Sequence, residues 1–502
     1  MNRNGRKLFS FVTVCCCSGL ALGARAADAT EPAAPPVTNE VRRVTLQECF
    51  EMALAQNLDL KIERLNPSIA RGDLGVAEAG YEPAFKLGGS RSSASNPLGS
   101  GTDTDRFTSS IGGSLPYGLS YDVGGDVSNT HGLAAPPYDS ASGSVGVSLT
   151  VPVLRGLFFD STRYNILVAR NRIKVSEWRL QDQVMAVLTS VEQAYYNAIL
   201  ARESYRVQEE GLRLAQRLAK ENKLRVQIGT MAKLEEKQSE SQAAAREADL
   251  STALRSLTSA QNKLKQLLTG DYASLHEVVL DPSESLQSAP VPLSVQESWR
   301  KGLSMRPDLV QARVDLERQG ITVKYDKNQL LPDLSLSGGY SHNASGTTSR
   351  EFSDAFGEFA SADRRGWNIG ANLTVPLGNK AARERYRQSK SNQDQLVLTL
   401  KKKEQSAMVE IDEAMNLARS SFAKIASSRK ARGYAEEALD AEQKKLAAGK
   451  STSFVVLQLQ RELISAKTDE IGALADYNNA LSALYRAEGS TLERHNIGMN
   501  VK

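Results

Sequence analysis

The residues most able to do chemistry in this chain are a short Gly-Lys-Ser sequence and four histidines. Gly449, Lys450 and Ser451 match the end of a phosphate-binding loop, G-x-x-x-x-G-K-[ST], but Lys444 occupies the position that requires the first glycine. The histidines have neither metal-ligand spacing nor a cysteine partner, so they predict no metal site and no catalytic triad. They are His131, His276, His342 and His495. We therefore expect no cofactor and no enzyme activity.

Residues 1–26 have the pattern of a secretory signal peptide. Basic residues precede an apolar stretch, residues 8–22, and Ala24-Arg25-Ala26 supplies a small-x-small cleavage pattern. Three of the four cysteines lie in this segment, so only Cys49 remains after cleavage and no intramolecular disulfide is expected. A lipid anchor on Cys15, Cys16 or Cys17 is the alternative, although no Leu-small-small run precedes them. The sequence leaves the lipidation status open.

The formal charge of +4 comes from the predicted signal, which holds four of the 62 basic residues and no acidic residue. The remaining basic residues equal the 58 acidic residues in number. Such a neutral chain does not favour a nucleic-acid partner. Beyond the signal no run of about 18 apolar residues occurs, so any membrane crossing would use β-strands.

The chain contains two copies of one unit. Residues 45–83 align without a gap on residues 294–332, and both copies begin with a capping-box pattern, Thr45-x-x-Glu48 and Ser294-x-x-Glu297. After each proline that closes these segments, the sequence changes to Gly/Ser-rich alternation with a period of two. This alternation predicts strands at about residues 84–152 and 333–376, each with one apolar and one small-polar face, as lipid-facing strands require.

Long helices follow each group of strands. Proline is absent from residues 153–280 and 377–502, which are rich in strong helix formers. Apolar residues recur every seven positions from Val184 to Ala219, which indicates a coiled-coil seam with small residues. Gly229 and Gly449 interrupt the two stretches, so each predicts a helical hairpin, the first with a helix from about Arg163 to Gln227. The repeated "LTVP" at residues 149–152 and 373–376 marks the strand-to-helix junctions.

Four strands per chain cannot close around a space, because small barrels need about eight. An open sheet edge in lipid leaves backbone groups unpaired at several kcal/mol each. We therefore expect three copies to pool their strands in lipid, with the helical hairpins forming a tube beneath. The fold class is mixed α and transmembrane β, internally duplicated, with a barrel formed by trimerisation.

The sequence resembles the TolC-like outer membrane efflux proteins over residues 45 to about 489. The resemblance is carried by the duplication, "RPDL" at Arg306–Leu309, the strand-Pro-helix junctions and "YNNALSALYRAEG" ending at Gly489. It implies a homotrimer with four strands per chain, located in the cell outer membrane with a periplasmic extension. It also implies two partners, a periplasmic membrane-fusion adaptor and an inner-membrane transporter of the RND or ABC type.

The resemblance carries site residues over at the hairpin tips. The adaptor-docking turns correspond to Gly229, Thr230 and Met231 and to Gly449, Lys450 and Ser451. Carboxylates often form rings just beyond such tips and favour cations. Glu235 lies at that place in the first repeat, but Val455 and Gln458 occupy it in the second. We therefore expect an apolar or polar constriction at the periplasmic aperture.

The predicted organisation is a signal peptide (1–26), a flexible leader (27–44), a first repeat (45–270), a connector (271–293), a second repeat (294–489) and a tail (490–502). Extra alternating sequence at about 105–128, with turn residues at 115–118, predicts an additional hairpin in the barrel region, without deciding whether it widens the barrel. The expected function is a passive exit channel for drugs, metabolites or metal ions. Two alternatives are the exit duct of a type I protein secretion system and an exported coiled-coil scaffold.

Overall fold

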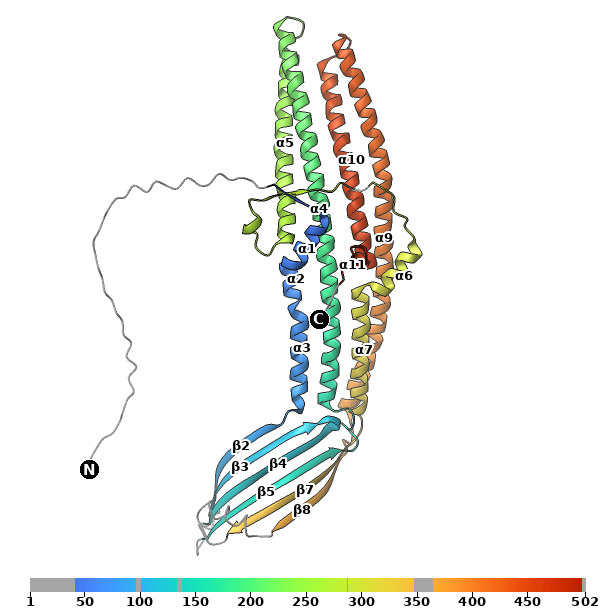
Figure 1. Cartoon of the computed structure of the whole chain (residues 1–502). Helices are drawn as coiled ribbons and strands as arrows, with labels where there is room; N and C mark the ends of the chain where they lie inside the picture. Colours follow the sequence, from blue (N-terminus) through green and yellow to red (C-terminus); the bar gives the residue numbers. More distant parts are fainter. Residues whose placement is uncertain (1–40, 96–100, 133–137, 287, 347–363, 499–502) are drawn as a thin grey trace, which may run out of the picture.

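The protein has two long helical hairpins at one end and a curved β-sheet at the other (Figure 1). The computed structural model describes residues 41–95, 101–132, 138–286, 288–346 and 364–498. In the first hairpin α4 (Ser161–Gln227) returns as α5 (Lys233–Leu268), and in the second α9 (Lys380–Ala447) returns as α10 (Ser453–Glu488). The 67 residues of α4 give a rod about 100 Å long at the helical rise of about 1.5 Å per residue.

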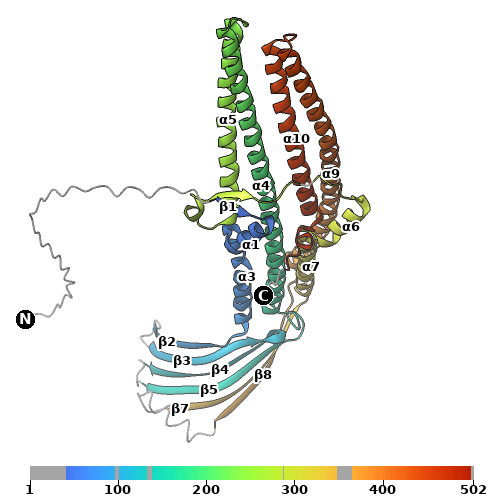
Figure 2. The same ribbon diagram turned by 45° about the horizontal axis from the view of Figure 1, so that its top comes forward.

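Shorter helices lie beside the half of each hairpin that is nearer the sheet (Figures 1 and 2). The first repeat contributes α1 (Leu46–Gln56), α2 (Leu58–Glu63) and α3 (Leu65–Glu78), which contact α4. The second contributes α6 (Val295–Met305) and α7 (Pro307–Asn328), which contact α9, and the short α11 (Thr491–Arg494) follows α10. In the described part of the chain, no helix combines the length and apolarity needed to cross a membrane.

The two predicted capping boxes have different outcomes. At α1 the box is present: Glu48 N donates to Thr45 Oγ1 at 3.2 Å and Thr45 N donates to Glu48 Oε2 at 3.1 Å. At α6 the Ser294 side chain makes no capping hydrogen bond. Glu297 instead lies 3.8 Å from the ammonium of Lys301, so an ion pair one turn along the helix replaces the second half of the box.

The β-sheet has six antiparallel strands in the order β2 (Ala84–Ser95), β3 (Gly101–Leu115), β4 (Leu119–Gly132), β5 (Tyr138–Pro152), β7 (Asp333–Gly346) and β8 (Arg365–Thr374). The expectation of four strands per chain is therefore wrong. The additional hairpin is β3 and β4, which pair with each other and with β2 and β5 along their lengths. The strands β3 and β4 are 15 and 14 residues long and alternate along their whole length. Each is therefore long enough to pair with a neighbouring strand on both of its edges, so the segment joins the sheet.

The register separates the sheet into an apolar face and a small-polar face. Cross-strand partners share a face, and one row runs Phe85, Ile111, Val123, Val147, Tyr340 and Trp367 across all six strands. These side chains are exposed, as are Leu87, Phe107, Val145, Leu149, Leu336, Ile369 and Leu373 on the same face. The opposite face carries mainly Gly, Ser, Thr and Asn. This arrangement confirms the predicted period-two alternation.

The main core lies where α1, α4 and α5 meet, at the middle of the molecule. Tyr195, Leu188, Phe50 and Leu264 are buried there. The predicted seam of α4 is buried at Val184, Val191 and Ala198 but only half-buried at Tyr205, Leu212 and Ala219. Nearer the tip Val207, Gly211, Ala215 and Leu218 are buried instead. A straight helix has 3.6 residues per turn, so a seven-residue repeat drifts off its buried face over this length.

A two-stranded parallel sheet joins the start of the described chain to the connector. In it β1 (Val41–Val44) pairs with β6 (Val279–Pro282). The last four residues of the predicted leader therefore form a strand, and Val44 is fully buried. The predicted signal peptide and the rest of the leader lie outside the described residues.

Candidate functional site: hairpin tips and channel-lining surfaces

The tip of the first hairpin is a helix-ending turn built on a left-handed glycine. Gly229 has φ +76°, and a Cβ there would meet nothing within 4 Å, so backbone conformation alone requires glycine. Gly229 N donates to Val226 O at 3.0 Å, and Thr230 N donates to Arg225 O at 2.9 Å. These are the bonds of a Schellman motif. The turn presents Gly229 and Thr230 to solvent, with Met231 half-buried beside them.

The second tip repeats this geometry. Gly449 has φ +72°, its amide donates to Leu446 O at 3.1 Å, and Lys450 N donates to Lys445 O at 2.9 Å. The Ser451 hydroxyl donates to the carboxylate of Glu442, which fastens the turn to α9. Gly449 and Lys450 are exposed. The two tips lie side by side at the end of the molecule farthest from the sheet (Figures 1 and 2).

Large apolar side chains surround both tips. Ile228 is 73% exposed and Leu234 68% exposed at the first, and Phe454 is 54% exposed at the second. Leu234 and Phe454 occupy the second position of α5 and of α10, respectively. Exposed apolar side chains gathered at one end of a protein mark an interaction surface. The tip glycines were found from the sequence, but these neighbours were not, although their position within five residues of each glycine was available as a signal.

The predicted aperture residues lie in the first two turns of the return helices. Glu235 is half-buried on α5, while Val455 and Gln458 are exposed on α10. The Gln458 amide donates to Glu462 Oε1 at 3.0 Å. One chain therefore carries a carboxylate on one hairpin and a methyl-bearing side chain at the equivalent place on the other.

Below the tips, polar contacts hold the two hairpins together. Ser453 Oγ, fully buried, donates to Asn222 Oδ1 at 3.1 Å. About four helical turns farther from the tip, Lys467 of α10 binds Glu210 of α4 at 3.1 Å. Gly211 lies against Ile464, and a Cβ there would approach Ile464 Cδ1 to 3.1 Å. Side-chain contacts therefore join the two hairpins at several levels below the tips.

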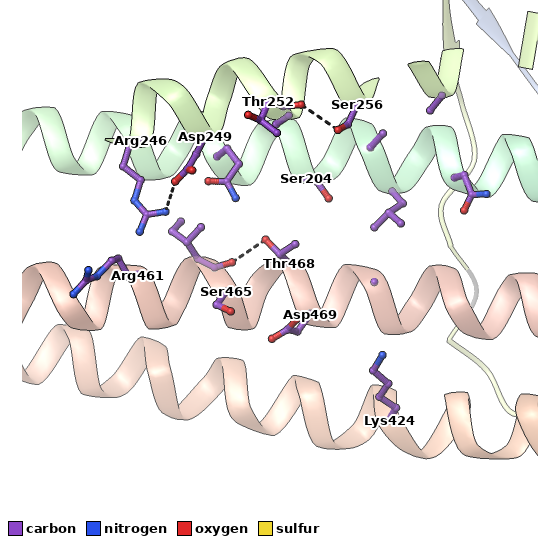
Figure 3. A pocket seen from close by; sticks show the side chains of 18 residues that line it. Ser204, Arg246, Asp249, Thr252, Ser256, Lys424, Arg461, Ser465, Thr468 and Asp469 are labelled. Atoms are coloured by element: carbon purple, nitrogen blue, oxygen red, sulfur yellow. Dashed lines mark hydrogen bonds and ion pairs between the residues drawn. The ribbon is translucent and has the colours of Figure 1, made fainter. Parts of the chain in front are cut away.

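A groove of about 840 Å³ lies between the two hairpins and is lined mainly by residues of α4, α5 and α10. Charged and hydroxyl side chains point into it from both hairpins, including Ser204, Asp249, Arg461 and Asp469 (Figure 3). Arg246 Nη1 donates to Asp249 Oδ2 at 3.1 Å, so part of this charge is already neutralised within α5. A polar, shallow wall of this kind suits contact with water or hydrated solutes rather than tight binding of an apolar ligand.

The polar face of the sheet is the second surface suited to line a channel. A depression of about 350 Å³ on it is lined mainly by Gly, Ser and Thr together with Asp122, Asp126 and Asn368. The described residues contain no group of three or more His, Cys, Asp or Glu side chains placed to hold a metal ion.

A clamp near the middle of the molecule joins the two motifs that carry the family resemblance. The Arg306 guanidinium donates to both Asp308 oxygens at 3.0 Å, to Glu410 Oε2 at 2.6 Å and to Ala487 O at 3.2 Å. Burial raises the Asp308 pKa, but the hydrogen bonds and charge of Arg306 outweigh it and hold that pKa below its ordinary value. The clamp is structural, since it fixes the end of α10 on the α6–α7 junction.

The family description "Outer membrane efflux protein" matches residues 50–270 and 300–490. The chain belongs to this family and is an outer membrane protein with a periplasmic helical part. It is similar to the pyoverdine export outer membrane protein OpmQ of Pseudomonas aeruginosa, with 24% identity over 66% of this chain and 67% of OpmQ. It is also similar to the cation efflux system protein CusC of Escherichia coli K12, with 23% identity over 73% of this chain and 69% of CusC.

Solved structures share the fold at low identity. The outer-membrane channel OprN matches with a TM-score of 0.69 and 16% identity, over 89% of this chain and 90% of OprN. The Campylobacter jejuni channel CmeC matches with a TM-score of 0.67 and 17% identity, over 91% of this chain and 90% of CmeC. These matches confirm the predicted fold class.

Proposed function

We propose that the protein is the trimeric exit channel of a tripartite efflux system, which conducts small molecules passively out of the cell. The observation that carries this proposal is the pair of free sheet edges. Within the described residues β2 and β8 each pair with one strand only, although an unpaired edge in lipid costs several kcal/mol per backbone group.

Pairing between copies removes these edges. Six antiparallel strands place β2 and β8 in opposite directions, so β8 of one copy can pair with β2 of the next and keep the whole ring antiparallel. Such head-to-tail contacts form a closed ring when the rotation closes. The exposed apolar face would then contact lipid, and the small-polar face would line the pore.

The tips are proposed to dock a periplasmic membrane-fusion adaptor, which connects the channel to an inner-membrane transporter of the RND or ABC type. Exposed turns at Gly229–Thr230 and Gly449–Lys450, each beside large apolar side chains, support this role. Export of pyoverdine and efflux of cations are the functions that the names of OpmQ and CusC state, and they favour small-molecule efflux for this chain.

The test of the channel is the mass and behaviour of the purified protein. We expect the protein to stay in the membrane fraction during carbonate extraction. In detergent it should form a particle of three chains, and in a planar bilayer it should conduct ions. A protein that leaves the membrane fraction in carbonate or high salt, or that is monomeric in detergent, would overturn the proposal and favour the scaffold.

The docking role is tested by a photoreactive residue placed at Thr230 or Lys450 in cells, with the exposed Lys220, about two turns before the end of α4, as control. The expected adduct is an adaptor protein at the tip positions and not at Lys220. Equal crosslinking at all three positions would remove the tips from the interface.

The aperture is tested by Val455→Asp. We expect the added carboxylates to shift bilayer reversal potentials toward cation selectivity. Unchanged selectivity in an intact trimer would mean that Val455 does not line the narrowest point.

A further inference from the structure

Among the described residues, a hairpin like β3–β4 between the outer strands of a repeat is present in the first repeat only. The repeats correspond at the start of β2 and β7, which follow the equivalent prolines Pro83 and Pro332. The first repeat then has two strands between β2 and β5, whereas β7 is followed directly by β8 in the sheet. The hairpin is therefore an insertion into a duplicated unit of two strands.

The insertion is continuous with the sheet on both sides. Every residue of β2 has a partner on β3, from Ala84 with Gly112 to Ser95 with Gly101. On the other side, β4 pairs with β5 from Ser120 with Thr150 to Gly132 with Tyr138. A hairpin lying outside the sheet would leave β2 and β5 to pair with each other, which this register excludes.

The turn of the hairpin is fastened to the strand-to-helix junction of β5 and α4. Gly118 has φ +78°, and a Cβ there would lie 2.8 Å from both Gly156 O and Pro152 Cγ. The ring of Tyr117 packs edge-on against Phe158 at 5.6 Å. The Arg163 guanidinium of α4 lies over the same ring, 5.6 Å from its centre. Such close packing fixes the hairpin at the helix-side rim of the sheet.

The two faces of the hairpin match the two faces of the sheet. Phe107, Ile111 and Val123 are exposed on the apolar face. The polar face instead carries Arg106, whose Nε lies 3.5 Å from Asp126 Oδ2, and Asp122, which lies over the bare Gly112. Both apolar and polar rows thus pass through the insertion without interruption.

We infer that the hairpin enlarges the outer-membrane pore to 18 strands and adapts it to bulky polar cargo. This inference rests on the trimer of the proposed function, since three chains of six strands make 18. With strands about 4.8 Å apart and tilted about 40°, 18 strands enclose a backbone circle about 36 Å wide, against about 24 Å for 12 strands. A layer of side chains takes about 5 Å from each wall. The free bore is then about 26 Å instead of about 14 Å.

The inserted strands also supply charges for the wider bore. Arg106, Asp122 and Asp126 lie on the polar face of the hairpin, where three copies would repeat them around the pore. Water and polar solutes would meet this wall, while an apolar cargo would not be favoured by it. Hydrated molecules too wide for a 12-stranded pore are therefore the cargo class that this barrel would admit once they have passed the aperture at the tips.

The test uses a cysteine reporter on β5, a strand that both a short and a long sheet contain. Ser148 lies on the polar face opposite Asp122 and is exposed, whereas Cys49, the one cysteine outside the predicted signal, is fully buried. Ser148→Cys is labelled with maleimide-polyethylene glycols of increasing size in the intact chain and in a chain lacking residues 101–132. That deletion places β2 next to β5 with Phe85 facing Val147. Val147→Cys, on the apolar face, is the matched control.

We expect the intact chain to admit polymers of roughly twice the diameter that the deletion admits, following the estimated bores, and Val147→Cys to resist the polymers. Equal size limits in two trimeric proteins would overturn the inference. If the deletion does not assemble, the strand count in a cryo-electron-microscopy map of the intact trimer decides: 18 strands support the inference, and 12 strands with the hairpin outside the wall refute it. A particle that is not a trimer would instead overturn the proposed function.

Discussion

The contact between Gly489 and Arg306 allows a quantitative prediction. Gly489 ends α10 with φ +72°, and a Cβ there would lie 3.1 Å from backbone atoms of Met305 and Arg306. Gly489→Ala therefore adds two costs, about 1–2 kcal/mol for a left-handed alanine and about 1–3 kcal/mol for overpacking against backbone that cannot move aside. The sum is about 2–5 kcal/mol of local stability.

The matched control is Gly449→Ala, which has the same backbone conformation but open space around its Cβ. It should lose only the conformational part, about 1–2 kcal/mol. Hydrogen–deuterium exchange measures both, because amide exchange through local opening reports the local free energy. At tenfold per about 1.4 kcal/mol, amides at the end of α10 should exchange about 30-fold to several thousand-fold faster in Gly489→Ala. Equal acceleration in the two variants would refute the packing argument.

Three further variants or treatments test the contacts of the helical part. Ser453→Ala leaves the buried Asn222 Oδ1 without its donor, so we expect a loss of about 1–3 kcal/mol in local stability below the tips, while Thr452→Ala at the exposed neighbour should be silent. Glu470 binds Arg429 and Arg432 at 3.1 and 3.0 Å. Because both arginines remain partly solvated, Glu470→Gln should lower the free energy of unfolding by only about 1–2 kcal/mol. The control Asp469→Asn should lower it by less, and thermal melting measures both variants. Burial, with the charges of Glu48 and Glu284, raises the pKa of the Cys49 thiol to about 12, so iodoacetamide at pH 8 should alkylate it only after denaturation; rapid alkylation of the folded trimer would contradict its burial.

The sequence predicts the helical hairpins well because their signals are local. Proline-free stretches of strong helix formers continue until a glycine takes a left-handed conformation, and the first helix ends at Gln227, as expected from Gly229. Period-two alternation likewise identifies both faces of the strands. The neighbours of a strand are not local information, however, and alternation at 107–111 could not show that the hairpin lies between β2 and β5.

The candidate site divides in the same way. Gly229 and Gly449 are predictable because one backbone conformation requires glycine at each turn. The contact of Asn222 with Ser453, 231 residues apart, depends on how the two repeats pack. That of Arg306 with Ala487 depends on how α10 packs on the α6–α7 junction within the second repeat, and no periodicity encodes either contact. Ser294 shows the limit of a motif, since α6 begins there without the predicted side-chain cap.

The parallel pairing of β1 with β6 has a consequence for biogenesis. Val41 pairs with Val279 at the start of the two strands. The hydroxyl of the fully buried Tyr195 donates to Val44 O, at the end of β1, at 3.1 Å. A chain that emerges N-terminus first must therefore hold its earliest strand without a partner until residue 279 has been translocated. A break in the chain just after residue 282 would leave that early module whole, whereas a break between residues 268 and 279 would strip the strand that shields its centre.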